Sequence, residues 1–143
     1  MNKIVFVCLG NICRSPMAEF VMKELDQEKS LHIESRATSS WEHGNSVHQG
    51  TQKILREYAI SFDSSKGSQQ ISQADFEFFD LVVGMDESNV EDLLQISAGR
   101  YDDKIKLFRP GGVPDPWYTG DFEETYKLVT AGCRDWLQWI KDR

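Results

Sequence analysis

Apolar and polar residues alternate along this chain in blocks that predict strands and helices in turn. Residues 3–8 form a nearly continuous apolar run, which is typical of a parallel strand buried on both faces. Ser15 and Pro16 follow, a favoured helix cap and a favoured first helical residue, and they predict a helix. The apolar residues expected on one face of that helix are Met17, Phe20, Val21 and Leu25.

The same periodicity predicts three more strands and three more helices. We expect strands at residues 32–38, 80–84 and 104–108, and helices at 51–58, from near 86, and from 122 onward. Loops are expected at 41–50 and at 109–116, where three of the four prolines lie. Residues expected to face the core from the second and last helices are Ile54, Leu55, Tyr58, Tyr126, Val129, Cys133, Trp136, Leu137 and Ile140.

Strands that alternate with helices predict an α/β fold. We expect a doubly wound sheet of four parallel strands with helices on both faces. The 143 residues, 40% of them hydrophobic, suffice for one domain, and we expect residues 1–143 to form it.

Charge and cysteine content exclude several classes of protein. A net charge of -7 disfavours nucleic acid and anionic membranes as partners. Three cysteines do not make a disulfide scaffold and favour a cytoplasmic location. No apolar window reaches the roughly 20 residues of a membrane span, and the apolar start is too short for a signal peptide.

The loop after the first strand is the expected ligand site, because ligands of such sheets bind beyond the carboxyl ends of the strands. Between Cys8 and Arg14 the backbone can wrap so that successive N–H groups point to one centre, with Gly10 supplying conformational freedom. The positive end of the next helix and the planar guanidinium of Arg14 complete a cup for a tetrahedral dianion.

The same positive field favours the thiolate of Cys8, the form that attacks phosphorus. The simpler interpretation is a buried Cys8 and a surface Arg14, but the glycine, the arginine and the helix cap all in register argue against it. Phosphoryl transfer from a phenol also needs a proton donor. Asp115, held between Pro114 and Pro116 beside Trp117 and Tyr118, fits that role better than an ordinary Asp-Pro turn.

The segments "CLGNICRSPMAE" and "DPWYTGDFEETY" together resemble the low-molecular-weight protein tyrosine phosphatases. The resemblance covers essentially the whole chain, since "TSSWEHG" and "FDLVVGMDESN" match intermediate segments of that family. It implies hydrolysis of protein phosphotyrosine through a phosphocysteine, with inorganic phosphate as product and no metal or other cofactor. A monomer is expected. Residues 46–70 depart from the family pattern, which leaves the outer hydrogen-bond network open.

Site residues follow from the resemblance. It implies Cys8 as nucleophile, Arg14 as phosphate clamp and Asp115 as general acid, then base. Phosphate would lie against the loop residues Leu9, Gly10, Asn11, Ile12, Cys13 and Ser15. Of these, Ser15 would donate a hydrogen bond to the thiolate. Asn11 would brace the loop through Ser35, Asp86 would support Arg14, and the substrate slot would have the walls Leu9, Trp41, Trp117 and Tyr118.

Four other functions remain to be weighed. An arsenate reductase of the same fold would relay a disulfide through two more cysteines in the middle of the chain. Residues 14–132 contain no cysteine, which argues against that function. A phosphocysteine carrier of sugar transport would need no general acid, so Arg14 and Asp115 argue against it. A non-catalytic phosphate-binding module would not need Cys8. A protein arginine phosphatase of the same fold resembles this chain but carries threonine at the position of Ile12, and the apolar residue favours phosphotyrosine.

The loop holds a second cysteine, Cys13. A curled loop can bring Cys8 and Cys13 within the ~7 Å between α-carbons that a disulfide allows. Cys13 could then capture an oxidised Cys8, and the family resemblance supports this interpretation; simple packing of Cys13 is the alternative. The histidines His32, His43 and His48 lack partners at the spacing of metal ligands.

Overall fold

The apolar run at the start of the chain forms β1 (Lys3–Cys8), one of the two central strands of a parallel sheet in the computed structural model, which describes residues 1–143. The other strands are β2 (His32–Ala37), β3 (Leu81–Gly84) and β4 (Ile105–Leu107). Their order is β2-β1-β3-β4, and every neighbouring pair is parallel. The expected α/β fold with four parallel strands is confirmed.

Alternate residues of the central strands enter two separate cores. Ile4 and Phe6 of β1 pack in the larger cluster, whereas Val5 and Val7 pack in a smaller cluster on the opposite face. Successive side chains of a strand point to opposite faces, so a strand covered on both sides is apolar at every position. This explains why the run from residue 3 to 8 shows no alternation in the sequence.

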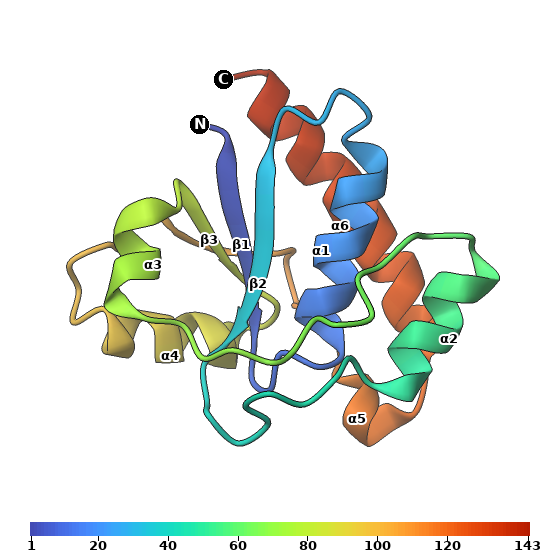
Figure 1. Ribbon diagram of the computed structural model, residues 1–143. Coiled ribbons are helices and arrows are strands. Elements are labelled where there is room, and N and C mark those ends of the chain that lie inside the picture. Colours follow the sequence, from blue (N-terminus) through green and yellow to red (C-terminus); the bar gives the residue numbers. More distant parts are fainter.

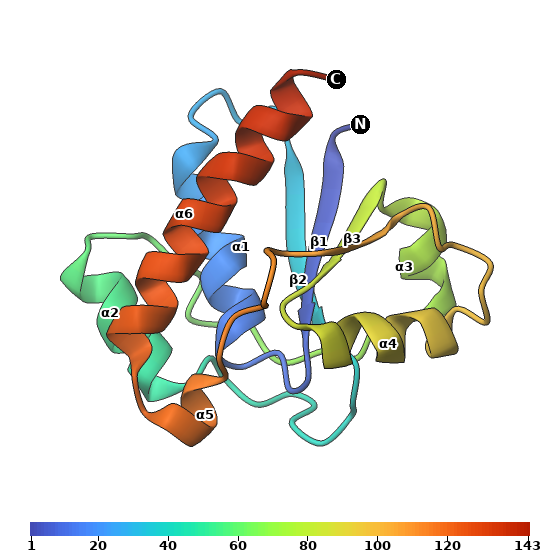
Figure 2. The ribbon, with the colours of Figure 1, turned by 180° about the vertical axis from the view of Figure 1, so that it is seen from behind.

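Helices cover both faces of the sheet (Figures 1 and 2). On one side lie α1 (Arg14–Leu25), α2 (Gln49–Glu57) and the long α6 (Phe122–Lys141). On the other lie α3 (Gln73–Phe78) and α4 (Glu87–Ile96). The short α5 (Pro116–Thr119) lies near the carboxyl ends of the strands, beside the loop that follows β1.

Four details differ from the sequence-based expectations. Helix α1 begins at Arg14, so Ser15 lies within its first turn and is not its cap. Tyr58 does not face the core: it is exposed and stacks on Tyr126. Helix α3 was not expected, and Pro116 starts a helix instead of ending the loop. The reason is local: Ser72 forms a capping box, and Asp115 caps the turn that Pro116 begins.

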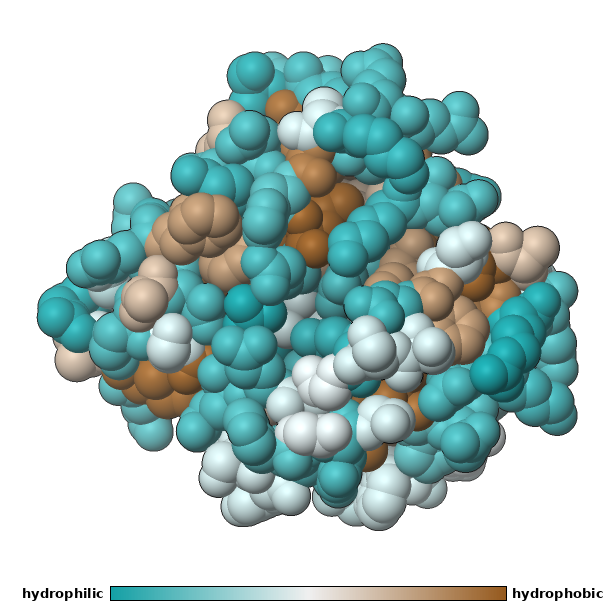
Figure 3. Space-filling view, in the orientation of Figure 1, coloured by the Kyte–Doolittle hydropathy of each residue, from teal (hydrophilic) through white to brown (hydrophobic).

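The surface is mainly hydrophilic, with apolar atoms in separated patches in the view of Figure 3. This agrees with a chain in which 27% of residues are charged. None of the helices combines the length and the apolar character that crossing a membrane requires.

Candidate active site

The loop from Cys8 to Arg14 turns sharply at Asn11, whose φ of 56° lies in the left-handed region. We expected Gly10 to supply this freedom, and that expectation was wrong, because Gly10 does not adopt a positive φ. A β-carbon on Gly10 would instead lie 3.3 Å from Cγ of Glu42. Asparagine tolerates the left-handed region better than most residues, and here its side chain also holds the turn in place.

The carbonyl groups of this loop are occupied by the surrounding chain. The N–H groups of Thr38 and Ser39 donate to the carbonyls of Cys8 and Leu9, and Ser68 Oγ donates to the carbonyl of Gly10 at 2.7 Å. The carbonyl of Ile12 accepts from the backbone of His48, and that of Cys13 accepts from Thr51. These contacts fix the direction of the peptide planes.

In contrast to the carbonyl groups, most backbone N–H groups of the same loop have no acceptor in the protein. The N–H of Asn11 donates to the sulfur of Cys8. The N–H groups without an acceptor in the protein include those of Gly10, Ile12, Cys13, Arg14 and Ser15. Buried N–H groups are nearly always paired in native proteins, so a run of unpaired donors at a helix N-terminus indicates an anion site.

The sulfur of Cys8 lies at this centre, and Cys8 as a residue is 3% exposed. It accepts the N–H of Asn11 at 3.3 Å and lies 3.1 Å from the hydroxyl oxygen of Ser15. The side chain of Asn11 donates to that same hydroxyl oxygen at 2.8 Å, so the proton of Ser15 is free for an acceptor, and the sulfur is nearer than the alternative, the carbonyl of Arg36 at 3.4 Å. Two donors therefore stabilise negative charge on Cys8.

The guanidinium of Arg14 is buried beside the loop and held by an acidic partner. Its Nη1 lies 2.6 Å from a carboxylate oxygen of Asp86 and donates to the carbonyl of Val113 at 2.9 Å. Burial alone would lower the pKa of Arg14, but negative charge at Cys8, the bond to Asp86 and the charge of Asp115 raise it. Its Nε is buried and has no partner in the protein, so one donor of the fork is left for a ligand.

The carboxyl group of Asp115 faces the same centre from the loop before α5. One oxygen accepts the N–H of Trp117 at 3.0 Å, which caps α5, and the other lies 3.5 Å from Nη2 of Arg14. The cap and the two flanking prolines fix the height of the carboxyl group. Its side chain is partly exposed, so protons can reach it from solvent.

These groups line a pocket of about 230 Å³. Cys8 and Arg14 form part of its lining, and Asp115 lies at its side. Its other walls are Leu9, Gly10, Ile12, Cys13, Trp41, Glu42, Trp117 and Tyr118. Trp41 and Tyr118 are each 77% exposed, which is unusual for large aromatic residues and leaves their rings free to contact a ligand.

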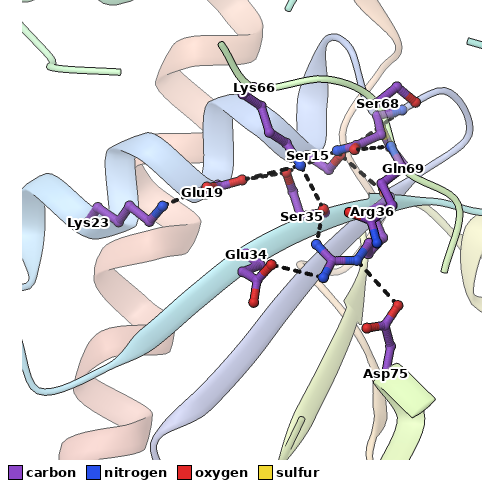
Figure 4. A network of polar contacts seen from close by, with 12 residues as sticks. Ser15, Glu19, Lys23, Glu34, Ser35, Arg36, Lys66, Ser68, Gln69 and Asp75 are labelled. Carbon is purple, nitrogen blue, oxygen red and sulfur yellow. Dashed lines mark hydrogen bonds and ion pairs between the residues drawn. The ribbon is translucent and has the colours of Figure 1, made fainter. Parts of the chain in front are cut away.

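A hydrogen-bond network braces the loop from behind (Figure 4). Asn11 Nδ2 donates to Ser15 and, at 2.9 Å, to Ser35, whose hydroxyl donates to the buried carboxylate of Glu19 at 2.6 Å. Lys66 closes the network: its Nζ donates to the carbonyl of Ser35 at 3.0 Å and lies 4.0 Å from Glu19. Burial lowers the pKa of Lys66, while the charge of Glu19 opposes the shift.

Every residue that the sequence placed in the site or behind it lies there in the structure. The pocket brings together Cys8, Cys13, Arg14, Asp115 and the aromatic walls, and Asn11, Ser15, Ser35 and Asp86 lie behind them. Sequence reasoning missed Glu19, Glu42 and Lys66. A signal existed for Glu19, which lies one helical turn after Ser15 in a helix that is otherwise largely apolar.

No group of three or more histidine, cysteine, aspartate or glutamate side chains is arranged to hold a metal ion. Cys13 and Cys133 are both buried, and burial raises the pKa of both thiols. Of the three cysteines, Cys8 alone has a sulfur that accepts a hydrogen bond from a backbone N–H of the loop.

Comparison with known proteins agrees with this geometry. The model of the family "Low molecular weight phosphotyrosine protein phosphatase" matches residues 3–143. The crystal structure of SP-PTP, a low molecular weight protein tyrosine phosphatase from Streptococcus pyogenes, is similar with a TM-score of 0.95 and 61% identity, over 96% of this chain and 92% of that one. Low molecular weight protein-tyrosine-phosphatase YfkJ of Bacillus subtilis is 40% identical over 152 residues, which cover 99% of this chain and 97% of the relative.

The crystal structure of DARP, a Drosophila arginine phosphatase, has the same fold, with a TM-score of 0.88 and 29% identity over 97% of this chain and 98% of that one. The family model and the Bacillus subtilis relative both match almost the whole length of the chain, and these two matches decide the family. The chain belongs to the low molecular weight phosphotyrosine protein phosphatases.

Proposed function

We propose that this family member hydrolyses phosphotyrosine on proteins through a covalent phosphocysteine on Cys8. One observation carries the proposal: the buried sulfur of Cys8 lies among backbone N–H groups that have no acceptor, with Arg14 and Asp115 at the same centre. A bound phosphoryl group would accept hydrogen bonds from those N–H groups and from the unpaired Nε of Arg14.

The first step is attack of the Cys8 thiolate on phosphorus, which forms an S–P bond and breaks the bond to the phenolic oxygen. The conjugate acid of that leaving group has a pKa near ~10, so its departure needs a proton. Asp115 supplies the proton to the phenolic oxygen. The donors of the loop stabilise the charge that spreads over the equatorial oxygens in the transition state.

The second step is hydrolysis of the phosphocysteine. The carboxylate of Asp115, left ionised by the first step, takes a proton from water while the water oxygen attacks phosphorus. The S–P bond breaks, inorganic phosphate leaves, and Cys8 returns to its thiolate. Ser15 and the N–H of Asn11 stabilise that thiolate as a leaving group.

The pocket supports an aromatic substrate. Trp41, Trp117 and Tyr118 offer ring faces at its mouth, and Ile12 presents an apolar side chain in its lining. A flat phenyl ring between such walls gains from apolar burial and from ring stacking. A serine phosphate has no ring to fill this slot.

A steady-state comparison tests the proposal. Purified protein is given peptides that differ only in carrying phosphotyrosine, phosphoserine or phosphoarginine. We expect kcat/KM to be highest for phosphotyrosine; a higher value for phosphoarginine would assign the chain to the arginine phosphatases instead.

The Cys8→Ser variant tests the covalent step. We expect loss of turnover with phosphate binding retained, because the amide donors and Arg14 remain. An acid quench of the wild type during turnover, followed by peptide mapping, should locate phosphate on Cys8. Substantial turnover by the pure variant would exclude this mechanism.

We propose that the protein acts in the cytoplasm and as a monomer. The first rests on the need to keep the thiol of Cys8 reduced, and the second on a site to which one chain supplies every residue.

A further inference from the structure

A second groove, of about 280 Å³, adjoins the phosphate pocket and shares two wall residues with it, Leu9 and Trp41. Its other residues are Thr38 and Ser39 of the loop after β2, and Asp92, Gln95 and Ile96 of α4. The indole of Trp41 therefore lies between the pocket that would take the phosphotyrosine ring and a groove that the phosphoryl transfer does not use.

Each hollow contains a carboxylate that no cation neutralises. Asp92 of α4 lines the second groove and forms neither an ion pair nor a side-chain hydrogen bond. Glu42 lines the pocket, and its one polar partner is the neutral amide of Asn45, at 2.6 Å. Arg14 is the single cation in the lining of either hollow, and it already faces Asp86 and Asp115.

The negative charges around the second groove indicate which kind of side chain it would bind. A peptide side chain that enters the second groove meets Asp92, and the adjoining pocket adds Glu42, which directly follows the shared residue Trp41 in the chain. An acidic side chain there would be repelled by both carboxylates, whereas lysine or arginine would be attracted. The methylene groups of a basic side chain can also pack along the indole while the charged end stays near water.

We propose that the groove lined by Leu9, Trp41 and Asp92 is a specificity subsite for a basic side chain next to the phosphotyrosine of the substrate. The proposal rests on the proposed function, since it places the phosphotyrosine in the neighbouring pocket. The chain would thus prefer phosphotyrosine in basic segments of proteins, although its catalytic loop needs only the phosphate. Because the two hollows share a wall, a residue close to the phosphotyrosine in the peptide can place its side chain in the second groove.

A peptide series tests the subsite. Phosphotyrosine peptides carry lysine, alanine or glutamate at each of the two positions on either side of the phosphotyrosine, and kcat/KM is measured at low ionic strength. We expect lysine to exceed glutamate at one of these positions by about three- to ten-fold, the range that a few partly exposed charge interactions produce. Raising the salt concentration should shrink the ratio.

Variants of Asp92 locate the effect. Asp92→Asn should bring the ratio of lysine to glutamate peptides closer to one, and Asp92→Lys should invert it. Asp103→Lys is the matched control, because it changes the net charge equally at an exposed position outside both hollows. If Asp92→Lys and Asp103→Lys change the ratio equally, overall charge acts and the subsite does not exist.

Free phosphotyrosine separates the two proposals. It has no flanking side chains, so its hydrolysis reports the catalytic loop alone. No turnover of free phosphotyrosine or of any peptide would contradict the proposed function. Turnover of free phosphotyrosine with equal rates for lysine and glutamate peptides would overturn the subsite and leave the function standing.

Discussion

At the residue scale, the proposed mechanism makes the departure of the phenol depend on the position of one carboxyl group, that of Asp115. Asp115 is fixed by its bond to the N–H of Trp117 and by the prolines on either side. In Asp115→Asn the fold of the loop keeps its cap, since asparagine also caps helices, but the proton donor is lost. We expect phosphotyrosine cleavage to slow by roughly 10²–10⁴-fold.

The leaving group provides the control for that prediction. An aryl phosphate whose phenol is much more acidic needs less protonation, so its single-turnover cleavage should slow far less in Asp115→Asn. Equal losses for the two substrates would show that Asp115 positions the substrate and does not donate the proton.

A second residue-scale prediction concerns the pair Cys8 and Cys13. Peroxide would convert the thiolate of Cys8 to a sulfenic acid, and the thiol of Cys13 could then displace water to form a disulfide. Burial and the nearby charge of Cys8 raise the pKa of Cys13, so Cys13 stays protonated and Cys8 is oxidised first. We expect wild type, but not Cys13→Ser, to recover most activity when a reductant follows peroxide.

Peptide mass mapping checks the mechanism of recovery. It should find a Cys8–Cys13 disulfide in the oxidised wild type. Cys133→Ala is the control, because Cys133 lies buried on α6 and donates to the carbonyl of Ala18. Equal recovery in all three proteins, without a mapped disulfide, would leave Cys13 with a packing role.

At the scale of elements, α6 packs closely against the end of β4. Gly132 lies where a β-carbon would overlap the ring of Phe108, which itself packs edge-on against Phe6. Trp136, one turn later, donates to the carbonyl of Phe108 at 2.8 Å. The glycine therefore sets how near α6 can approach the strand that leads to the Asp115 loop.

Gly132→Ala tests this packing. Overpacking costs about 1–3 kcal/mol and alanine recovers about 1 kcal/mol of helix propensity, so we expect a net loss of stability of up to about 2 kcal/mol in urea unfolding. Ala131→Gly, at an exposed neighbouring position, should lose about 1 kcal/mol from propensity alone. A more stable Gly132→Ala protein would mean that Phe108 moves aside without cost.

At the scale of the whole molecule, a ligand of the native site stabilises the fold by mass action. The loop donors exist as a cluster in the folded chain alone, so inorganic phosphate at about 100 times its Kd should add ~2.7 kcal/mol to the free energy of unfolding. We expect the Tm of the wild type to rise by several degrees with phosphate. Sodium chloride at equal ionic strength is the control.

The Arg14→Lys variant identifies the group responsible. Lysine keeps the charge beside Asp86 but loses the planar fork, so the phosphate-induced rise in Tm should shrink markedly. The comparison uses the change in Tm and is therefore independent of any change in the variant's own stability. An equal rise in both proteins would place the stabilising phosphate elsewhere.

The sequence determined those features that depend on local patterns. Apolar runs at residues 3–8 and 80–84 predicted two buried strands, and the stripe from Tyr126 to Ile140 predicted α6. Cys8, Arg14 and Asp115 could be proposed as site residues because their neighbours, a helix start and two prolines, are recognisable in the sequence. Helix α3 was not predicted, because a helix of six residues is too short to show a clear helical period of apolar residues in the sequence.

Tertiary structure decided what depends on segments that are distant in the chain. Tyr58 looked apolar at core spacing, but α2 presents it to Tyr126 and to Glu123 of α6 at the surface. Asn11 takes the left-handed conformation in place of Gly10 because Ser15, Ser35 and Gln69 satisfy its side chain from three directions.

The hydrogen-bond network behind the loop also depends on contacts between distant segments. Glu19 and Lys66 are 47 positions apart, and nothing in the spacing of either residue indicates the other. They meet behind Ser35 because β2 pairs with β1 in a register that places Ser35 opposite Phe6, two residues before Cys8. Local periodicity specifies elements, whereas the pairing of distant strands and the burial that follows determine which polar groups must satisfy one another.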